Sequence, residues 1–302
     1  MTLTELRYII TLAHEKHFRK AAERCYVSQP TLSVAIKKLE EELDLTIFER
    51  SRTEVQVTPL GEKIIAQARK VLEEADVIKA IANEGKGQLN TPLRVGAIFT
   101  IGPYLFPHII RHIKDRAPNM ALILEENYTS VLRQKLRHGE LDVIVISLPF
   151  NEPNTEVLDL YDEPFRILIP ATHPLAEKKS ITKRQLEKEK VLLLGDGHCF
   201  RDQVLHACPS INKEFDATDI PLGTSLETLR HMVASGLGLT ILPGSASDNS
   251  IYDSDTLVER PFAGKTPFRR VSLVWRKRFP RAQAIDALAT SINSCAIPGA
   301  SR

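Results

Sequence analysis

The feature that most constrains the fold of this chain is a regular alternation of strand-like and helix-like segments that begins at Leu93. Apolar runs with the length of buried strands alternate with amphipathic stretches of helical spacing. We expect strands at 93–98, 121–125 and 141–146, with helices at 103–116 and 131–138. Because each helix carries the chain back across the sheet, this order places the strands in parallel. The sequence therefore predicts an α/β domain here.

A second unit of the same kind follows Leu160. Strands are expected at 165–169, 191–194, 238–243 and 271–275, and helices at 182–189, 225–235 and 281–294. We expect the chain to cross between the units near Leu160 and again near Phe268. This predicts one subdomain of about 91–161 and 268–302 and another of about 162–267, and 302 residues suffice for a core in each.

Two cysteines lie at opposite ends of one predicted helix in the second unit. Cys199 follows the strand at 191–194 and a pair of glycines, and helical spacing of apolar residues begins there. Pro209 places Cys208 at or just past the helix end. Nine helical residues would hold the cysteines about 13 Å apart. A disulfide needs Cα atoms within about 7 Å, so joining the two thiols must unwind the helix.

The two thiols differ in their expected surroundings. A thiol at a helix N-terminus lies near unpaired N–H groups and the positive end of the helix dipole, which favour the thiolate. Arg201 adds to this effect at Cys199, as does His198 when it is protonated, whereas nearby aspartates oppose it. Cys208 has no comparable help. A thiolate near a second thiol is the arrangement that redox sensors use.

Two other interpretations of these cysteines stay open. Cysteines in a cytosolic chain are most often unrelated, buried small hydrophobic residues. A soft-metal cluster could be formed by His198, Cys199, His206 and Cys208. Their spacing is not usual for zinc, and four ligands along one helix cannot all face one ion. We therefore expect no metal and no cofactor.

The first sixty residues carry the pattern of a helix-turn-helix. A short helix at 17–25 is followed by a second helix that Ser28 can cap and whose first turn tolerates Pro30. The second helix of such a pair enters the major groove of DNA. Basic residues outnumber acidic ones between Lys16 and Lys38, which suits phosphate contacts although the net charge is only +2. The candidates for base readout are Gln29, Thr31 and Ser33.

A long helix is predicted from Pro59 to about Gly87. Its apolar residues alternate spacings of four and three, the pattern of a coiled-coil seam, at Ile64, Ala68, Val71, Ala75, Ile78 and Ala82. A lone helix has nothing to bury this seam against, so we expect dimerisation through it. Glycines and Pro92 then indicate a hinge.

The N-terminal motif resembles the winged helix-turn-helix of LysR-type transcriptional regulators. The resemblance rests on Phe18, Ala21, Ala22, Ser28, Gln29, Pro30, Leu32, Ser33, Ile36, Leu39, Glu40, Leu43, Leu45, Phe48, Arg50 and Thr58, with departures at Cys25 and Asp44. It implies a DNA-binding domain at 1–58 with a wing at 50–57, a linker helix at 59–90 and a two-subdomain regulatory domain at 91–302, similar to periplasmic binding proteins. The implied DNA contacts are Ser28, Gln29, Pro30, Thr31, Ser33, Lys37 and Arg50.

Three further motifs resemble the peroxide-sensing members of this family. They lie at 95–108, at 197–208 and at 225–234. The resemblance implies that Cys199 is the peroxidatic thiol, that Cys208 resolves it, and that peroxide is held by Thr100, Thr129, His198, Arg201 and Asp202. Thr100 and Thr129 follow strands and His198 precedes Cys199, so these groups can converge beyond the strand ends. Cys25 and Cys295 match no motif and are interpreted as a core residue and a C-terminal bystander.

The resemblance also implies partners. These are operator DNA, hydrogen peroxide, further copies of the chain as a dimer and a tetramer, glutaredoxin or thioredoxin as reductant, and RNA polymerase. We expect a cytoplasmic protein without a membrane partner, because the sequence has neither a signal peptide nor an apolar stretch of membrane-spanning length. One alternative is a regulator that binds a small metabolite reversibly in the cleft. Another is a thiol peroxidase, but the DNA-binding motif argues against an enzyme.

Overall fold

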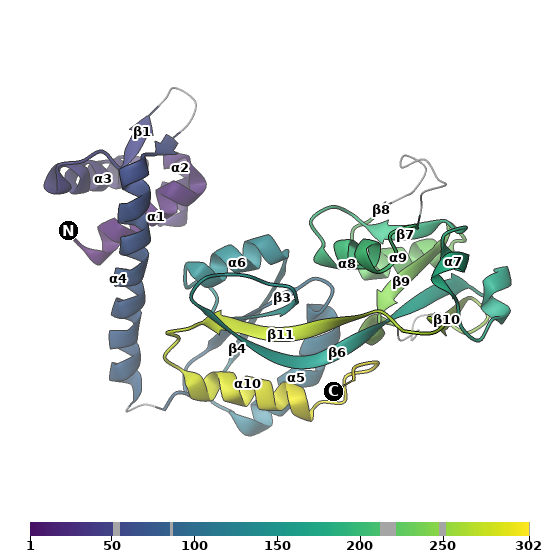
Figure 1. Ribbon diagram of the computed structural model, residues 1–302. Helices are drawn as coiled ribbons and strands as arrows, with labels where there is room; N and C mark the ends of the chain where they lie inside the picture. The colour runs from purple at the N-terminus through teal and green to yellow at the C-terminus, as the bar shows by residue number, and fades with distance from the viewer. Residues whose placement is uncertain (51–54, 85–86, 212–221, 248–251, 302) are drawn as a thin grey trace. The chain divides into compact units, whose positions relative to one another are not determined.

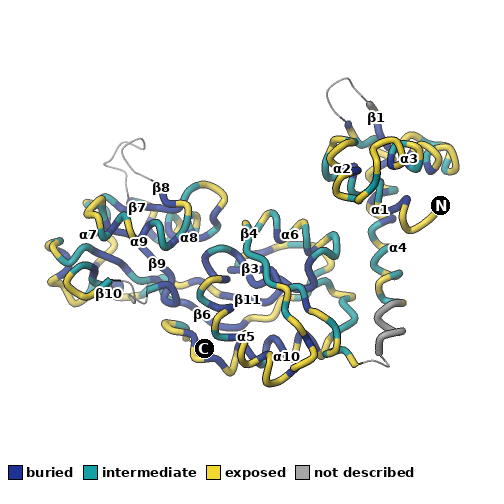
Figure 2. The backbone as a smooth tube through the Cα atoms, turned by 180° about the vertical axis from the view of Figure 1, so that it is seen from behind, coloured by how far each residue is buried: buried dark blue, intermediate teal, exposed yellow. Residues whose placement is uncertain are grey.

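The computed structural model describes residues 1–50, 55–84, 87–211, 222–247 and 252–301 (Figure 1). These residues form two compact units, Met1–Gly85 and Lys86–Arg302. Each unit contains a buried core of its own, visible as the dark segments of Figure 2.

The N-terminal unit is a helix-turn-helix, as predicted. Its elements are α1 (Leu3–Glu15), α2 (Phe18–Arg24), α3 (Gln29–Leu43), β1 (Phe48–Arg50), β2 (Val55–Val57) and α4 (Pro59–Glu84). The Ser28 side chain caps α3 by accepting a hydrogen bond from the Thr31 amide, and Pro30 lies in the first turn. β1 and β2 pair antiparallel as expected for a wing, but residues 51–54 between them lie outside the described part.

The first half of α4 packs against the N-terminal core. Ala68 is buried there, and Ile64 and Val71 are partly buried against the same core. Our expectation that this helix has nothing to bury its seam against was therefore wrong for its first half, because α1 lies alongside it. Ile78, farther along, is 68% exposed, and the side chain of Ala82 lies outside the described part.

The C-terminal unit is built on one continuous mixed sheet. Its strands are β3 (Leu93–Ile98), β4 (Leu122–Asn127), β5 (Val143–Ser147), β6 (Thr155–Pro170), β7 (Val191–Leu194), β8 (Leu222–Gly223), β9 (Leu239–Pro243), β10 (Leu257–Pro261) and β11 (Phe268–Arg276). They follow the order β4-β3-β5-β11-β6-β9-β7-β8, with β10 also paired to β6. β3 is parallel to β4 and β5, which confirms the predicted strand–helix alternation.

The strand at the first crossing between the subdomains is longer than predicted. A strand was expected only at 165–169, whereas β6 is a single strand of 16 residues. It pairs antiparallel with β11 along its first part and with β9 along its second part, so that β6 runs from one subdomain into the other (Figure 1). One extended strand, β6, therefore carries the chain across the boundary near Leu160.

The helices of this unit cover the sheet. They are α5 (Gly102–Arg116), α6 (Thr129–Arg137), α7 (Lys183–Leu186), α8 (Cys199–Ala207), α9 (Leu226–Ala234) and α10 (Ala282–Ser294), with short 3-10 turns at η1 (Pro174–Glu177) and η3 (Gly244–Ala246). α7 is shorter than the helix predicted at 182–189, and β10 was not predicted. Cys295 is 4% exposed in the apolar core of the first subdomain, so it is a core residue rather than a bystander.

Two separate apolar cores lie in the C-terminal unit, one per subdomain. α8 touches both. Phe200, Val204 and Cys208 belong to the second core, whereas Cys199 packs against the first. The helix with the two cysteines therefore lies where the subdomains meet.

Candidate functional site

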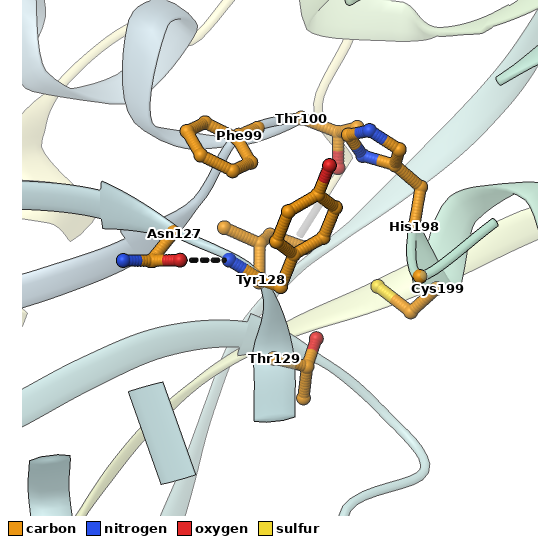
Figure 3. A pocket seen from close by; sticks show the side chains of 9 residues that line it. Phe99, Thr100, Asn127, Tyr128, Thr129, His198 and Cys199 are labelled. Atoms are coloured by element: carbon orange, nitrogen blue, oxygen red, sulfur yellow. Dashed lines mark hydrogen bonds between the residues drawn. The ribbon is translucent and has the colours of Figure 1, made fainter. Parts of the chain in front are cut away.

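A small pocket lies beyond the ends of three strands in the C-terminal unit. It is lined by residues that end or follow β3, β4 and β7, namely Ile98, Phe99, Thr100, Asn127, Tyr128, Thr129, Gly197, His198 and Cys199 (Figure 3). The space accepts little more than one water-sized molecule. The structure therefore brings together the two hydroxyls, the imidazole and the thiol that the sequence placed after separate strands.

Two helices begin at the pocket wall. Thr129 is the first residue of α6, and Cys199 is the first residue of α8. Among the described residues, no N-cap side chain accepts a hydrogen bond from the first backbone N–H groups of either helix. Both helix N-termini therefore favour negative charge near Cys199.

Thr129 carries a buried hydroxyl with an unused hydrogen-bonding capacity. Within the described part of the chain its Oγ1 has no hydrogen-bond partner. A buried hydroxyl without a partner loses free energy of about 1–3 kcal/mol relative to a satisfied one. A small polar molecule in the pocket would supply the missing hydrogen bond.

Thr100 is oriented by a buried ion pair that sequence reasoning missed. Arg269 donates to Thr100 Oγ1 at 2.8 Å and to the Thr100 carbonyl oxygen at 2.7 Å. Its Nε also bonds Glu163 Oε2 at 2.6 Å, and both charged residues are at most 2% exposed. Glu163 in turn accepts the Ser245 amide at 2.8 Å. The Thr100 hydroxyl is therefore held with its oxygen already accepting one hydrogen bond.

The signal for Arg269 was present in the strand pattern. It lies two residues before Val271, on the buried side of β11, whereas its neighbour Arg270 is exposed. In a strand, side chains alternate between faces, so this arginine occupies an inward position. Its partner Glu163 lies opposite it on β6, in a segment that the sequence did not predict to be a strand.

His198 is enclosed by aromatic rings. The centroid of its ring lies 4.9 Å from that of Tyr128 and 6.1 Å from that of Phe99, and the two aromatic residues contact each other edge to face (Figure 3). Burial lowers the pKa of the imidazole, and a hydrogen bond to the backbone of Thr224 offsets this in part. His198 is therefore neutral near pH 7, and the contribution we expected from a protonated His198 is absent at that pH.

Gly197 makes the turn into α8 possible. Its φ of +91° is a conformation that side chains rarely adopt, and an added Cβ would lie 3.4 Å from the Tyr128 ring. Glycine at this position lets the chain leave β7 and present His198 and Cys199 to the pocket.

The remaining predicted pocket residues lie outside the pocket wall. Arg201 turns back to donate to the Leu194 carbonyl oxygen at 2.9 Å, and its Nε lies 3.5 Å from Asp196 Oδ1. It therefore braces the turn between β7 and α8. Asp202 is exposed on the first turn of α8.

The Cys208 thiol lies at the opposite end of α8, in the second core. It is 2% exposed, and both it and Cys199 are free thiols. Burial raises the pKa of the Cys208 thiol, Lys183 lowers it and Glu187 raises it further. Lys183 also donates to the Ala207 carbonyl oxygen at 2.6 Å, which caps the end of the helix.

One further side chain ties α8 to the first subdomain. Gln203 Nε2 donates to Ser147 Oγ at 2.8 Å, at the end of β5. Its Oε1 is buried and has no hydrogen-bond partner within the described residues. Gln203 lies inside the motif at 197–208, and the structure gives its side chain a contact across the subdomain boundary.

The predicted DNA-contacting residues gather at the start of α3. Gln29, Pro30 and Thr31 are exposed, as is Lys37, while Ser33 is partly exposed. Lys37 Nζ lies 3.5 Å from Glu41 Oε1, an exposed pair of small energetic weight. The side chain of Arg50 lies outside the described part of the chain.

Among the residues that the structure describes, no group of three or more His, Cys, Asp or Glu side chains could hold a metal ion. No helix in the described ranges is long and apolar enough to cross a membrane.

Comparison with protein families places both units. Residues 3–62 match the family described as bacterial regulatory helix-turn-helix protein, lysR family, and residues 86–294 match the LysR substrate binding domain. The chain therefore belongs to the LysR family of bacterial transcriptional regulators.

Similar proteins match nearly the whole length of the chain. The DNA-binding transcriptional dual regulator OxyR of Escherichia coli K12 is 38% identical over 294 residues, which are 97% of this chain and 95% of the relative. The hydrogen peroxide-inducible genes activator of Haemophilus influenzae is 36% identical over 299 residues, covering 97% and 96%. HTH-type transcriptional regulator EstR of Acinetobacter baylyi is 33% identical over 289 residues, covering 95% and 94%.

Solved structures agree with these relatives. A full-length OxyR from Pseudomonas aeruginosa, with one cysteine replaced by aspartate, is 54% identical, covers 100% of this chain and 98% of its own, and superposes with a TM-score of 0.81. A cysteine-to-serine OxyR mutant from Corynebacterium glutamicum, described as H2O2-bound, is 34% identical, covers 97% and 91%, and has a TM-score of 0.65.

Proposed function

We propose that this chain is a transcriptional regulator that senses hydrogen peroxide through Cys199 and stores the signal as a Cys199–Cys208 disulfide. One observation carries the proposal. Cys199 shares a pocket about the size of one water molecule with Thr100 and Thr129. A second free thiol, Cys208, lies at the far end of the same helix. Relatives named for hydrogen peroxide span nearly the whole chain.

The first chemical step takes place in the pocket. The Cys199 thiolate attacks one oxygen of hydrogen peroxide, the S–O bond forms as the O–O bond breaks, and hydroxide leaves and takes up a proton. Thr129 Oγ1, which has no partner within the described residues, and the Arg269-oriented Thr100 would hold the peroxide oxygens. Neutral His198 closes one wall, and Arg201 supports the site by bracing the turn before it. A peroxide role for Asp202 stays a prediction.

The second step requires α8 to unwind. The Cys208 thiolate attacks the sulfur of the Cys199 sulfenic acid, the S–S bond forms, and hydroxide leaves. An intact helix keeps these sulfur-bearing residues about 13 Å apart, too far for a disulfide. Oxidation therefore replaces α8 and its contacts with both cores by a different local fold, and this change is the signal.

The output is altered DNA binding. We propose that α3 lies in the major groove and that Ser28, Gln29, Pro30, Thr31, Ser33, Lys37 and Arg50 contact the operator. Exposed Ile78 supports dimerisation through the second half of α4. The resemblance to the LysR family implies that two dimers form a tetramer. Cytoplasmic location, reduction by glutaredoxin or thioredoxin and contact with RNA polymerase complete the proposal. Its action is regulatory rather than enzymatic.

The test is peptide mass mapping of the reduced full-length protein after one equivalent of hydrogen peroxide, with free thiols blocked at quenching. We expect a linked peptide that contains Cys199 and Cys208, and a DNA footprint that differs between the two redox states. Two free thiols after peroxide treatment would overturn the redox mechanism. An unchanged footprint despite the disulfide would overturn only its coupling to DNA.

A further inference from the structure

The start of α3 uses two of its hydroxyl groups within the protein. Ser28 Oγ accepts the Thr31 amide at 3.3 Å, and the Ser28 and Thr31 hydroxyl oxygens lie 2.7 Å apart in a hydrogen bond. This cap fixes both side chains to the helix end. Their freedom to turn toward base edges is correspondingly reduced, which gives more weight to the other residues on this face.

Val34 occupies the centre of the outward face of α3. Its side chain is 68% exposed, whereas Leu32, Ile36 and Leu39 are fully buried. At 100° per residue, Val34 lies about 200° around the helix from Leu32, opposite the core. Exposed Pro30 precedes it by one turn on the same face.

The surroundings of Val34 fit DNA rather than an apolar partner. Lys37 and Lys38 are exposed on the next turn of α3. Lys37 lies 3.5 Å from exposed Glu41, a surface pair of small energetic weight, so both lysines stay free to turn toward phosphates. An apolar side chain with lysines on the next helical turn is suited to the major groove, whose phosphates flank the bases and whose one apolar feature is the thymine C5-methyl group. No such methyl group is presented by cytosine, adenine or guanine.

We propose that Val34 is a specificity residue that packs its two methyl groups against a thymine methyl in each operator half-site. The inference rests on the proposed binding of α3 in the major groove. It adds an apolar contact to the polar readers, and it predicts a preference for thymine that no hydrogen bond from Val34 could give.

The experiment compares thymine with deoxyuridine, which differs only by the missing methyl group. An operator is first selected from random DNA with the reduced full-length protein, and each thymine is then replaced singly by deoxyuridine. We expect one position per half-site where the replacement weakens binding about fourfold, the effect of burying one methyl-sized group. With Val34→Ala, overall binding weakens and this deoxyuridine effect disappears.

Two variants keep the result interpretable. Val34→Thr preserves the shape but replaces one methyl by a hydroxyl, and it should also reduce the preference for thymine over deoxyuridine. Lys38→Gln should weaken binding to all sequences and reduce its salt dependence while leaving the deoxyuridine effect intact. Retention of the full deoxyuridine effect in Val34→Ala would overturn the inference. Failure of the wild-type protein to select any DNA would instead contradict the proposed function.

Discussion

The two ends of helix α8 carry the same functional group in opposite surroundings. Cys199, at the start, lines a pocket beside two hydroxyl-bearing side chains and two helix N-termini. Cys208, at the end, is 2% exposed among apolar residues, and burial raises the pKa of its thiol. One end is arranged to receive a small polar molecule, and the other is arranged to exclude it.

This difference separates the two steps of the proposed reaction. Cys199 can react without any change in the fold, because the pocket already reaches it. Cys208 can react only after it leaves the second core and α8 unwinds. The contacts that hold the helix in place, among them Phe200 and Val204 in the core and Gln203 on Ser147, therefore set the free energy that disulfide formation must supply. In this proposal, the Cys199 end of α8 selects peroxide, and the release of the Cys208 end changes the fold.

The largest expected effect comes from removing each thiol in turn. Cys199→Ser should abolish the reaction with one equivalent of peroxide, whereas Cys208→Ser should gain one oxygen as a sulfenic acid and stop there. Mass spectrometry of the intact protein distinguishes these products. A disulfide or a sulfenic acid formed by Cys199→Ser at a comparable rate would show that the two ends are equivalent.

The next effect concerns the pocket. Thr129→Val keeps the shape of the side chain but removes the unpartnered hydroxyl. We expect the rate constant of peroxide reaction to fall about tenfold or more. Negative charge develops on the leaving peroxide oxygen in the transition state, and a hydrogen bond to a charged group contributes about 1.5–3 kcal/mol. Thiol loss is followed in the Cys208→Ser background. Ser130→Ala, an exposed neighbour, is the matched control and should react at the parent rate.

A smaller effect, an increase in rate rather than a decrease, is expected for a variant in helix α8. Gln203→Met removes the hydrogen bond to Ser147 and should accelerate conversion of sulfenic acid to disulfide about fivefold, from a contribution of about 1 kcal/mol. Quenched-flow alkylation measures this step. His206→Gln, exposed on the last turn, should leave it unchanged. An unaltered rate in Gln203→Met would mean that α8 does not need to leave Ser147.

The smallest expected effect is on how the stability of the fold depends on pH. Because the pKa of Cys208 is raised in the fold, its contribution to stability is fully present below the pKa of the unfolded thiol, about 8.5, and is lost as pH rises through the higher folded pKa. The thermal unfolding temperature (Tm) of the reduced wild type should therefore fall with alkaline pH more steeply than the Tm of Cys208→Ala. The same pH dependence of Tm in both proteins would contradict the buried position of this thiol.

The sequence predicted most reliably those elements whose signals are local. The caps, apolar spacing and turn residues of α2 and α3 lie within a few residues of each other, and the structure confirms both helices. The helical segment between Cys199 and Cys208 was predicted for the same reason. By contrast, the length of β6 was missed because its pairing with β11 joins segments about a hundred residues apart, and such partners leave no local pattern.

The sequence by itself determined the family, the order of the units and the identity of the two cysteines that flank α8. Only the tertiary structure decided how each thiol is used. It oriented Thr100 through Arg269 and Glu163, left Thr129 Oγ1 facing the pocket and enclosed Cys208 in a core. The physical reason is that hydrogen-bond geometry, burial and pKa depend on neighbours brought together from distant strands, and no short stretch of sequence specifies them.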